Sequence, residues 1–553
     1  MVSSHEGAWD ARGAMPGGRV RPCRGARDTF GRMPRPAGPP SPFSTADLGR
    51  DLARRSTRSG AAVLVGQGLT TVITLGATAV LARLLTPVDY GLVGMVAAVT
   101  AFIVCFRDLG LTQATVQRDD ITHEQVSNLF WINAVVGLVG AGLAAVLAYP
   151  IAWFYGEPEL VPITLALALA FPLTAVGAQH RAILQRRMRF RALAVVRVLA
   201  TLVGFAVAVV VALATANYWA LVAAELVTAA MLSAGPWLAS GWTPGLPKRR
   251  VSVRSLVRFG AFLALTNLLG AAQRNVDKVV VGRAFGDAAL GAYSRAYAIL
   301  FLPITQLTQP LTQVALPTLA RMQDEPERFR AFYRRGLSTV ALLAVPGAAF
   351  TFVAADPIVR ALLGSQWGLA TPIVRALAPA LMVGSLNVAT AWPYLALGRT
   401  DRQFRWLCIA TAVYVPAFIV AAQLSAVAVA GAVSAVLVGL RLPAVAYCFR
   451  GTPLGVVADF IAPVWRPVAA AVAAAALLEF AAASERGRAA AEGLVAPVEI
   501  VVLAVAFGGL YAACLAIAPG GVRQLRDAAA LVRHFKRSRG VQQEAASPDA
   551  DGV

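Results

Sequence analysis

An otherwise apolar stretch, residues 259–281, contains a dense group of polar and charged side chains. Its members are Asn267, Gln273, Arg274, Asn275, Asp277 and Lys278. Arg and Lys suit anion binding, because a guanidinium can grip a phosphate through two parallel hydrogen bonds and an ammonium acts as a point charge. A helix places Arg274, Asp277 and Lys278 on one stripe, together with Asn267. Charges facing lipid would cost roughly 3 kcal/mol each, so we expect this stripe to face protein or a water-filled cleft.

The same stretch allows a second interpretation. Arg274 and Asp277 are three residues apart, the spacing of an ion pair within a helix, so the pair could instead be a structural salt bridge that joins this helix to a neighbour. Under the first interpretation, Asp277 orients the two cations or links them to a counter-ion. The cluster would lie four to eight residues before the end of the helix, in the half nearer the outer surface.

Other residue types that carry chemistry are scattered along the chain. The five cysteines and four histidines show neither a CxxC nor an HExxH spacing, and no GxxxxGK[ST] phosphate loop occurs. These patterns predict no metal ion, no organic cofactor and no catalytic triad. The sequence therefore favours a protein that is not an enzyme, and it disfavours an ATP-driven pump.

The elements that hold these residues are expected to be membrane-spanning helices. Of the 553 residues, 58% are hydrophobic and 14% charged, and the mean hydropathy is +0.64, which is too apolar for a soluble globular protein. The fold class is therefore an all-α polytopic membrane protein with about 14 transmembrane helices. The predicted segments are 61–82, 88–106, 127–148, 161–180, 192–213, 216–238, 259–281, 288–317, 336–354, 371–395, 406–424, 426–448, 464–484 and 495–518.

Basic residues are distributed unevenly among the predicted connections. There are 50 lysines and arginines against 29 aspartates and glutamates, a formal net charge of +21. If the N-terminus lies inside, arginines gather in the inner connections, for example 181–191, 248–258 and 321–335, and the outer connections hold few. The positive-inside rule then predicts that both termini are cytoplasmic. The basic charge thus serves topology and contact with membrane lipids, and no nucleic-acid partner is expected.

The chain repeats itself at a fixed offset of 200 residues. Matching positions include Arg58 and Arg258, Gly60 and Gly260, Gly91 and Gly291, and the Leu-Thr-Gln triplets at 111–113 and 311–313. Because the offset spans six predicted helices, an even number, both halves cross the membrane in the same direction. We therefore predict two six-helix bundles related by a parallel internal repeat, followed by a C-terminal helix pair.

This repeat defines the predicted domain organisation. The parts are a disordered basic cytoplasmic arm (1–58), an N-terminal six-helix lobe (59–238), a cytoplasmic inter-lobe linker (239–258), a C-terminal six-helix lobe (259–450), the extra helix pair (451–518) and a cytoplasmic tail (519–553).

The repeat also relates the charged stripe to a polar stripe on the first predicted helix. The corresponding pairs are Gln67 with Asn267, Thr74 with Arg274 and Thr78 with Lys278, and Thr71 lies on the same face. One face is neutral and polar, and the other is charged. A central cavity shared by two lobes would require this arrangement.

Proline and glutamine recur along the eighth predicted helix, 288–317. The residues are Pro303, Gln306, Gln309, Pro310, Gln313 and Pro317. Proline removes a backbone donor and kinks a helix, and such backbone is tolerated at membrane depth beside protein or a water-lined cavity. The segment is therefore either a bending or gating element, with Gln306 and Gln309 near the substrate, or a helix with static packing kinks.

Several other polar residues are weaker candidates. Tyr293, Arg295 and Tyr297 could contact substrate, but an interfacial belt is the favoured interpretation. The residues Glu225, Arg375, Asn387 and Arg441 could each couple protons or form a structural pair. His123 is expected to be a solvated loop residue.

Three stretches of the sequence resemble a known family. They are LARLLTPVDYGLVGM, RDLGLTQATVQRDDITHEQVSNLFWIN and RNVDKVVVGRAFGDAALGAYSRAYAI. They are similar to bacterial polysaccharide exporters of the Wzx type, in the multidrug/oligosaccharidyl-lipid/polysaccharide flippase superfamily. The resemblance covers about residues 58 to 450, with the last two helices as the extra pair often found in that group.

The resemblance implies a function and a location. Such a protein would move an undecaprenyl-pyrophosphate-linked oligosaccharide to the outer leaflet of the bacterial cytoplasmic membrane by alternating access, for exopolysaccharide, lipopolysaccharide or another surface glycan. Arg274 and Lys278 would then contact phosphate or anionic sugar. The inner residues Arg186, Arg187 and Arg189 could receive the pyrophosphate instead. Implied partners are glycosyltransferases, a polysaccharide polymerase and a coupling proton or Na+.

Other functions remain open on the sequence alone, among them a lipid II flippase of a related family and a scaffold that organises glycosyltransferases. A drug or cation antiporter of the same superfamily would favour acidic residues in its cavity, whereas this chain offers mostly cationic ones. A polytopic polysaccharide polymerase or ligase would need catalytic groups on a large outer loop. The longest predicted outer loop, 355–372, contains only Asp356 and Arg360 as charged residues.

Overall fold

The computed structural model describes residues 52–107, 112, 115–116, 121–248, 254–484, 495–524 and 526. These residues are almost entirely helical, and no strand occurs among them. The predicted arm lies outside the described residues up to position 51. Its predicted boundary at 58 falls inside the first helix, which already begins at Leu52. Most of the predicted tail also lies outside the described residues.

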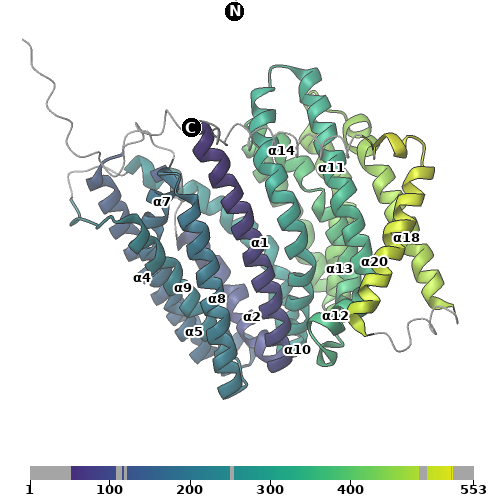
Figure 1. Cartoon of the computed structure of the whole chain (residues 1–553). Helices are drawn as coiled ribbons and strands as arrows, with labels where there is room; N and C mark the ends of the chain where they lie inside the picture. Colours follow the sequence, from purple (N-terminus) through teal and green to yellow (C-terminus); the bar gives the residue numbers. More distant parts are fainter. Residues whose placement is uncertain are drawn as a thin grey trace, which may run out of the picture.

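The N-terminal half forms one group of helices (Figure 1). They are α1 (Leu52–Leu84), α2 (Pro87–Arg107), α4 (His123–Tyr155), α5 (Leu160–Ala168), α6 (Ala170–Val176), α7 (Ala178–Arg186), α8 (Phe190–Thr215) and α9 (Trp219–Ser240). The helices α5, α6 and α7 together make one span with two short breaks. We call this group the N-terminal lobe.

The remaining helices form the C-terminal lobe. They are α10 (Arg254–Arg321), α11 (Pro326–Val353), α12 (Ala355–Leu362), the short η2 (Ser365–Trp367), α13 (Ala370–Ser385), α14 (Val388–Ala396), α15 (Thr400–Ala421), α16 (Ala426–Gly439), α17 (Arg441–Phe449), the π-helical η3 (Val456–Ile461), α18 (Ala462–Ala483) and α20 (Ala496–Ile517). The extra pair docks on this lobe, since α18 packs on α11 and α20 packs on α12.

The helix α10 contains both the seventh and the eighth predicted spans. Its backbone leaves helical geometry at Gly286, with φ 79° and ψ −172°, a conformation that glycine adopts without strain. The two arms therefore run on either side of Gly286. By length and composition, twelve helices of the described residues can cross a membrane, and α10 is not among them. The count of fourteen spans stays a prediction.

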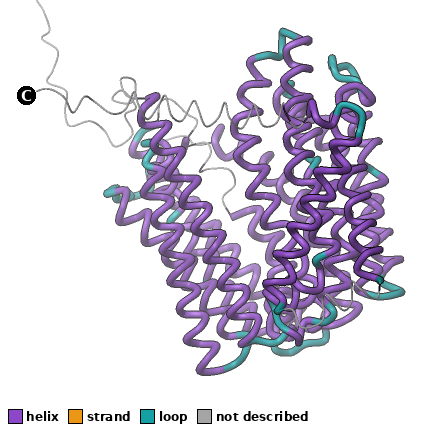
Figure 2. Tube along the Cα trace, turned by 45° about the vertical axis from the view of Figure 1, so that its right-hand side comes forward, coloured by secondary structure: helices purple, strands orange, loops and turns teal. Residues whose placement is uncertain are grey.

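The two lobes meet at one end and diverge toward the other (Figures 1 and 2). We call the end that holds Gly286 and the turns at 85–86 and 354–369 the closed end. The opposite end, with the connections at 187–189, 241–248 and 322–325, is the open end. The extended contacts between the lobes involve α2 with α10, α1 with α12, and α4 with α10.

Repeat-related glycines form the closest crossing between the lobes. A Cβ atom on Gly91 would lie 1.9 Å from the carbonyl oxygen of Asp287, and one on Gly291 would lie 1.9 Å from that of Pro87. The two contacts are related by the repeat, because Gly91 and Gly291 are 200 residues apart and so are Pro87 and Asp287. The crossing of α2 with α10 is therefore nearly two-fold symmetric. This geometry supports the internal repeat that the sequence predicts.

Side chains of the C-terminal lobe also cap the end of α1. Gln366 donates to the carbonyls of Ala82 and Leu85 at 2.6 and 3.1 Å, and the Trp367 indole donates to Ala82 at 2.9 Å. Arg83 donates in the opposite direction, to the carbonyl of Ala361, at 2.9 Å. The carbonyls at the end of a helix lack partners within the helix, so these bonds satisfy them across the lobe boundary.

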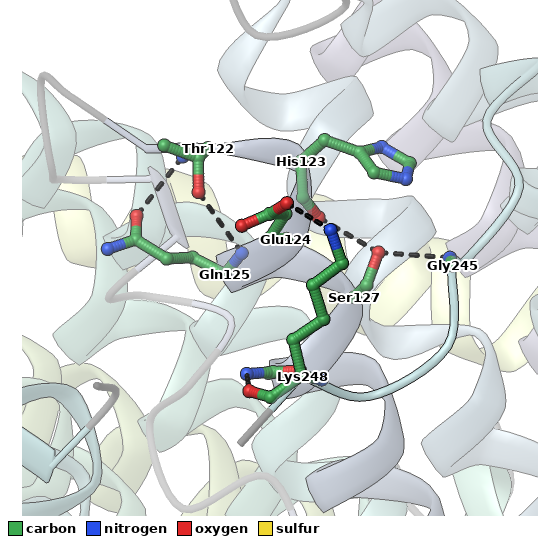
Figure 3. A network of polar contacts seen from close by, with 8 residues as sticks. Thr122, His123, Glu124, Gln125, Ser127, Gly245 and Lys248 are labelled. Atoms are coloured by element: carbon green, nitrogen blue, oxygen red, sulfur yellow. Dashed lines mark hydrogen bonds and ion pairs between the residues drawn. The ribbon is translucent and has the colours of Figure 1, made fainter. Parts of the chain in front are cut away.

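The inter-lobe linker is anchored to α4 along its described part (Figure 3). The Asn128 side chain accepts from the Lys248 N–H and donates to the Lys248 carbonyl, both at 2.9 Å. The Gly245 N–H donates to Ser127 at 3.0 Å, and the Trp242 indole donates to His123 Nδ1 at 3.0 Å. His123 is therefore the first residue of α4 and an acceptor for the linker, and its interpretation as a mere solvated loop residue is wrong.

Candidate functional site

Asp277 holds the two arms of α10 together near the closed end. Its carboxylate is buried, with 4% of the residue exposed, and it accepts a hydrogen bond from the Tyr293 hydroxyl at 2.8 Å. Tyr293 is fully buried on the second arm, so the belt interpretation is wrong for this residue. The alternative salt bridge with Arg274 does not form, because none of the ion pairs of the described residues includes Asp277.

Lys278 lies against an aromatic face of the second arm. Its ammonium is 5.0 Å from the centroid of the Tyr297 ring, and it is 3.4 Å from the amide oxygen of Asn275. Tyr297 in turn stacks on Phe301, with ring centroids 4.1 Å apart. A cation over an aromatic ring is stabilised without being neutralised. Within the described residues, Lys278 has this ring and the Asn275 amide as partners and forms no ion pair.

Arg274 is exposed, and it has neither a hydrogen bond nor an ion pair within the part of the chain that the structure describes. It precedes Gly286 by twelve residues, about 18 Å along a helix axis, and Lys278 precedes Gly286 by eight residues, about 12 Å. The helix ends later than the sequence analysis predicted. The cluster consequently lies deeper in the span, with Arg274 near its middle.

Arg295 adds a third cation to this region. Its guanidinium lies 4.5 Å from the centroid of the Tyr90 ring on α2, so it bridges the two lobes through a cation–π contact. Lys278 lies within electrostatic range of Arg274, Arg295 and the Asp277 carboxylate, so the group contains three cations and one carboxylate. The group has an excess of positive charge inside an apolar helix bundle, and a bound anion would compensate it.

The polar stripe of α1 presents acceptors. Gln67, Thr74 and Thr78 are each half-buried. The Thr74 hydroxyl donates to the Thr70 carbonyl and the Thr78 hydroxyl to the Thr74 carbonyl, each at 2.8 Å. Because each hydroxyl hydrogen is used within the helix, these oxygens can only accept from a ligand. They match the hydroxyl groups of a sugar better than the oxygens of a phosphate.

The two stripes are not in direct contact. Within the described residues, α1 and the first arm of α10 make no extended contact, although each is the first helix of its lobe. Each instead packs on the fifth span of its own lobe. The Gln273 amide on α10 donates to the Leu407 carbonyl at 3.0 Å and to Thr411 at 2.8 Å, both on α15.

The sequence analysis missed Arg197, the corresponding partner on α8. Its guanidinium donates to the Gln67 side-chain oxygen at 3.5 Å, so the N-terminal face is not neutral as predicted. The available signal was a lone arginine in the second turn of an otherwise apolar span. Such a residue deserves a functional hypothesis by default.

Other predicted residues have ordinary structural partners or cannot be placed. The side chains of Asn267 and Gln306 lie outside the described residues, and Gln309 is exposed. The α10 backbone remains helical through all three prolines, and its break is at Gly286. The structure therefore places the irregular backbone at the closed-end turn, before the predicted proline segment.

Of the weaker intramembrane candidates, some form structural contacts and one is exposed. Arg375 pairs with Glu479 of α18 at 3.5 Å, and Arg441 donates to Asn387, so both contacts join helices of the C-terminal lobe. Glu225 is exposed on α9.

The inner arginines are used by the protein itself. Arg186 donates to the Thr115 carbonyl at 3.2 Å, Arg187 to the Ser240 carbonyl at 3.2 Å and Arg189 to the Ala239 carbonyl at 3.0 Å. The last two bonds tie the connection between α7 and α8 to the end of α9, and the first ties the end of α7 to Thr115, between α2 and α4. This role weakens the alternative that these three residues receive the pyrophosphate.

Proteins of known structure share this fold. A lipid II flippase MurJ in an inward closed conformation superposes with a TM-score of 0.64 at 12% identity, covering 81% of this chain and 97% of that protein. An inward-facing multidrug resistance MATE family transporter of the MOP superfamily gives a TM-score of 0.50 at 16% identity, covering 74% of this chain and 95% of the transporter. At these identities the likeness concerns the fold.

Proteins of similar sequence point to surface-glycan synthesis. The chain is 26% identical over 385 residues to the lipopolysaccharide biosynthesis protein WzxC of Escherichia coli (strain K12), covering 67% of this chain and 76% of WzxC. It is 29% identical over 332 residues to the succinoglycan biosynthesis transport protein ExoT of Rhizobium meliloti (strain 1021), covering 60% of this chain and 67% of ExoT. A family model described as polysaccharide biosynthesis protein matches residues 80–372, which is more than half of the chain. The chain therefore belongs to this polysaccharide biosynthesis protein family.

Proposed function

We propose that this protein is a flippase that moves a lipid-linked oligosaccharide, with an undecaprenyl diphosphate carrier, across the bacterial cytoplasmic membrane. The observation that carries the proposal is the excess of cations on α10, where Arg274 and Lys278 have no ionic partner in the described part of the chain. An anionic headgroup that must cross an apolar bundle needs such groups. The family and the fold agree with a transporter of this kind.

The geometry suggests a division of labour between the two stripes. Arg274 is suited to a bidentate grip on a diphosphate, and Lys278 is suited to a point-charge contact. The hydroxyls of Thr74 and Thr78, which can only accept, would take hydrogen bonds from sugar hydroxyl groups. Asp277 acts indirectly, because its bond to Tyr293 fixes the spacing of the two arms that present these cations.

The open end is proposed to face the cytoplasm. Arginine-rich connections lie there, and the positive-inside rule places such connections on the cytoplasmic side. Both termini would then be cytoplasmic, and the substrate would enter from the leaflet in which it is built. Glycosyltransferases that assemble the oligosaccharide and a polymerase that consumes it are the expected partners, with a proton or Na+ gradient as the driving force.

The experiment compares cells that lack the gene after complementation with wild type, Arg274→Ala, Lys278→Ala or Thr74→Ala. We expect the deletion to accumulate carrier-linked oligosaccharide on the cytoplasmic face and the two charge variants to fail at normal membrane levels. Arg335→Ala, at an exposed arginine of α11, is the matched control and should complement fully. If the deletion accumulates no such intermediate, the flippase proposal is wrong.

The competing functions have less support from the geometry. A cation antiporter would need an accessible acidic group in the α10 cluster, whereas Asp277, the acidic residue there, is buried and bonded to Tyr293. A polymerase or ligase needs free catalytic groups at the closed end. There, Arg360 pairs with Asp356 and with Glu499, each at 2.8 Å. The two charged residues of the predicted outer loop are thus engaged in ion pairs that join α12 to α20.

A further inference from the structure

Arg197 occupies an unusual position in α8. The span Phe190–Thr215 contains two charged residues, Arg191 in the first turn and Arg197 in the second. Arg197 is exposed, and none of the ion pairs formed by the described residues includes it. A cation this far into a span is costly unless it meets water or an anion.

Its position is fixed by a close approach of two helices. A Cβ atom on Gly66 of α1 would lie 2.8 Å from the Cβ of Ala194, so α1 and α8 pack tightly at that level. Gln67 and Arg197 therefore come together, and the guanidinium donates to the Gln67 oxygen at 3.5 Å. Gln67 belongs to the polar stripe of α1. The Arg197 guanidinium is thus held beside that stripe, with most of its five N–H donors unused.

The contrast with neighbouring arginines supports a ligand-binding role. Arg186, Arg187 and Arg189 lie a few residues earlier, and each donates to a backbone carbonyl. Arg197 has only a long bond to a neutral amide. Of these four arginines, Arg197 alone lies inside a span and makes no bond to the backbone within the described residues.

The depths of the cations form a series. Arg197 precedes the end of α8 at Thr215 by 18 residues, which places it about 27 Å from the closed end. Arg274 and Lys278 lie about 18 and 12 Å from the turn at Gly286. The distance along the helix axis therefore falls by between one and two helical turns from Arg197 to Arg274, and again from Arg274 to Lys278. An anion could therefore pass from the open end to the middle of the bundle while remaining near a positive charge.

We propose that Arg197, positioned by Gln67, is the loading site at which the substrate diphosphate first binds at the open end, before it reaches Arg274 and Lys278. This inference rests on the proposed flippase function. The ligand chemistry is a phosphate ester beside a lipid chain, which the carrier diphosphate and the headgroup of an anionic phospholipid share. The experiment must therefore separate these two sources.

Binding to the purified full-length protein provides the first test. The protein is placed in nanodiscs of a zwitterionic lipid and titrated with farnesyl diphosphate, and the titration is repeated in nanodiscs containing phosphatidylglycerol. We expect Arg197→Gln to weaken farnesyl diphosphate binding about tenfold and Arg197→Lys to weaken it less, because lysine keeps the charge but loses the bidentate geometry. Arg191→Gln, on the same helix, should bind as wild type does.

The outcomes distinguish the possibilities. If phosphatidylglycerol abolishes the difference between wild type and Arg197→Gln, the residue binds bulk lipid and the loading-site proposal is overturned. Equal binding by Arg197→Gln, Arg191→Gln and wild type would also overturn it, while leaving the flippase function intact. If wild type itself binds no farnesyl diphosphate, the proposal fails, and the accumulation assay in cells then decides separately whether the flippase function survives.

A transport readout separates loading from structure. In cells, Arg197→Gln should lower the rate of glycan export at limiting substrate and recover when the carrier-linked oligosaccharide is overproduced, as expected for weakened capture. Arg274→Gln should not recover in this way, because Arg274 acts later in the path. A variant that merely misfolds would show reduced membrane levels and no recovery. If Arg197→Gln reaches normal membrane levels and its export still does not recover, the proposal is contradicted.

Discussion

The closed and open ends of the molecule are built on different principles. At the closed end the backbones of the two lobes are in contact, because Gly91 and Gly291 have no side chain to keep the facing helix away. Beside this crossing, Tyr90 packs edge-on against Trp367, with ring centroids 5.4 Å apart. At the open end, the polar contacts among the described residues stay within one lobe, as in the anchoring of the linker to α4. The difference indicates that the two lobes are held together at the closed end by the tightly fitted crossing of α2 with α10.

The largest effect is expected from Gly91→Ala or Gly291→Ala. The added Cβ would fall 1.9 Å from a carbonyl oxygen of the other lobe, and backbone cannot move aside as a side chain can. We expect each variant to lose about 3 kcal/mol of stability, the upper part of the range for overpacking, and to lose export. Thermal unfolding in detergent and glycan export in complemented cells measure the two effects.

Gly142→Ala is the matched control, because a Cβ at Gly142 on α4 meets no atom within 4 Å. This substitution should be neutral or stabilise the helix by about 0.5–1 kcal/mol. If all three variants behave alike, the glycine crossing is not a tight contact, and the comparison between the two ends loses its basis.

A smaller effect is expected when the cap on α1 is removed. Gln366→Ala leaves the carbonyls of Ala82 and Leu85 with fewer donors, and Trp367→Phe removes one bond while keeping most of the packing. Each lost bond should weaken the closed end by about 1 kcal/mol and shift the population toward a form open at that end. Labelling of a cysteine introduced at Thr78 by an impermeant reagent from outside the cell reports this shift.

The control for this pair is Gln423→Ala at the same end. The Gln423 side chain is exposed, and it makes no side-chain hydrogen bond within the described residues. Labelling should therefore match the parent. Increased labelling in the control, or unchanged labelling in Gln366→Ala, would show that the cap does not hold the end closed.

The open end should respond to a change in tether length. From the anchored Lys248 to the start of α10 at Arg254 there are six residues, which span at most about 20 Å. Asn128→Ala removes both bonds to Lys248 and would lengthen the free tether by about three residues, back to Gly245, which Ser127 still holds. We expect a broader distance distribution between spin labels at positions 191 and 335 in a background without native cysteines.

A nearby exposed ion pair supplies the control for the tether. Lys248 pairs with Glu124, but both side chains are substantially exposed, so Glu124→Gln should change stability by less than about 1 kcal/mol. The distance distribution should stay as in the parent. A narrow distribution in Asn128→Ala would show that the linker does not limit separation of the lobes.

The helical membrane fold could be predicted from the sequence because hydropathy is a property of each segment and the internal repeat recurs at a fixed offset. The pair Gly91 and Gly291 was visible as a match at an offset of 200, and the structure gives it a physical reason, the mutual approach of two backbones. The bond between Asp277 and Tyr293 was not predictable in this way. It depends on how the arms of α10 meet across Gly286, which no spacing along a single helix contains.

The candidate site was predicted in part for the same reason. A helical wheel grouped Arg274, Asp277 and Lys278 on one stripe, yet the structure buries Asp277 and exposes Arg274, since neighbours decide which edge of a stripe is covered. Arg197 was missed because a single charge in a span forms no motif. Its importance emerges only from the absence of an ionic partner in the described residues and from its contact with Gln67.

The smallest effect is expected on the polar stripe of α1. Thr78→Val keeps the shape of the side chain and removes a hydroxyl whose hydrogen is already donated to the Thr74 carbonyl at 2.8 Å. Stability should change by no more than about 0.5 kcal/mol, because that carbonyl is a helix acceptor in any case. Export should fall two- to fivefold if the oxygen accepts from a sugar, and Thr78→Ser, which keeps the acceptor, should restore it. Equal export by the valine and serine variants would show that the stripe only lines the path, and would confine recognition to the cations of α8 and α10.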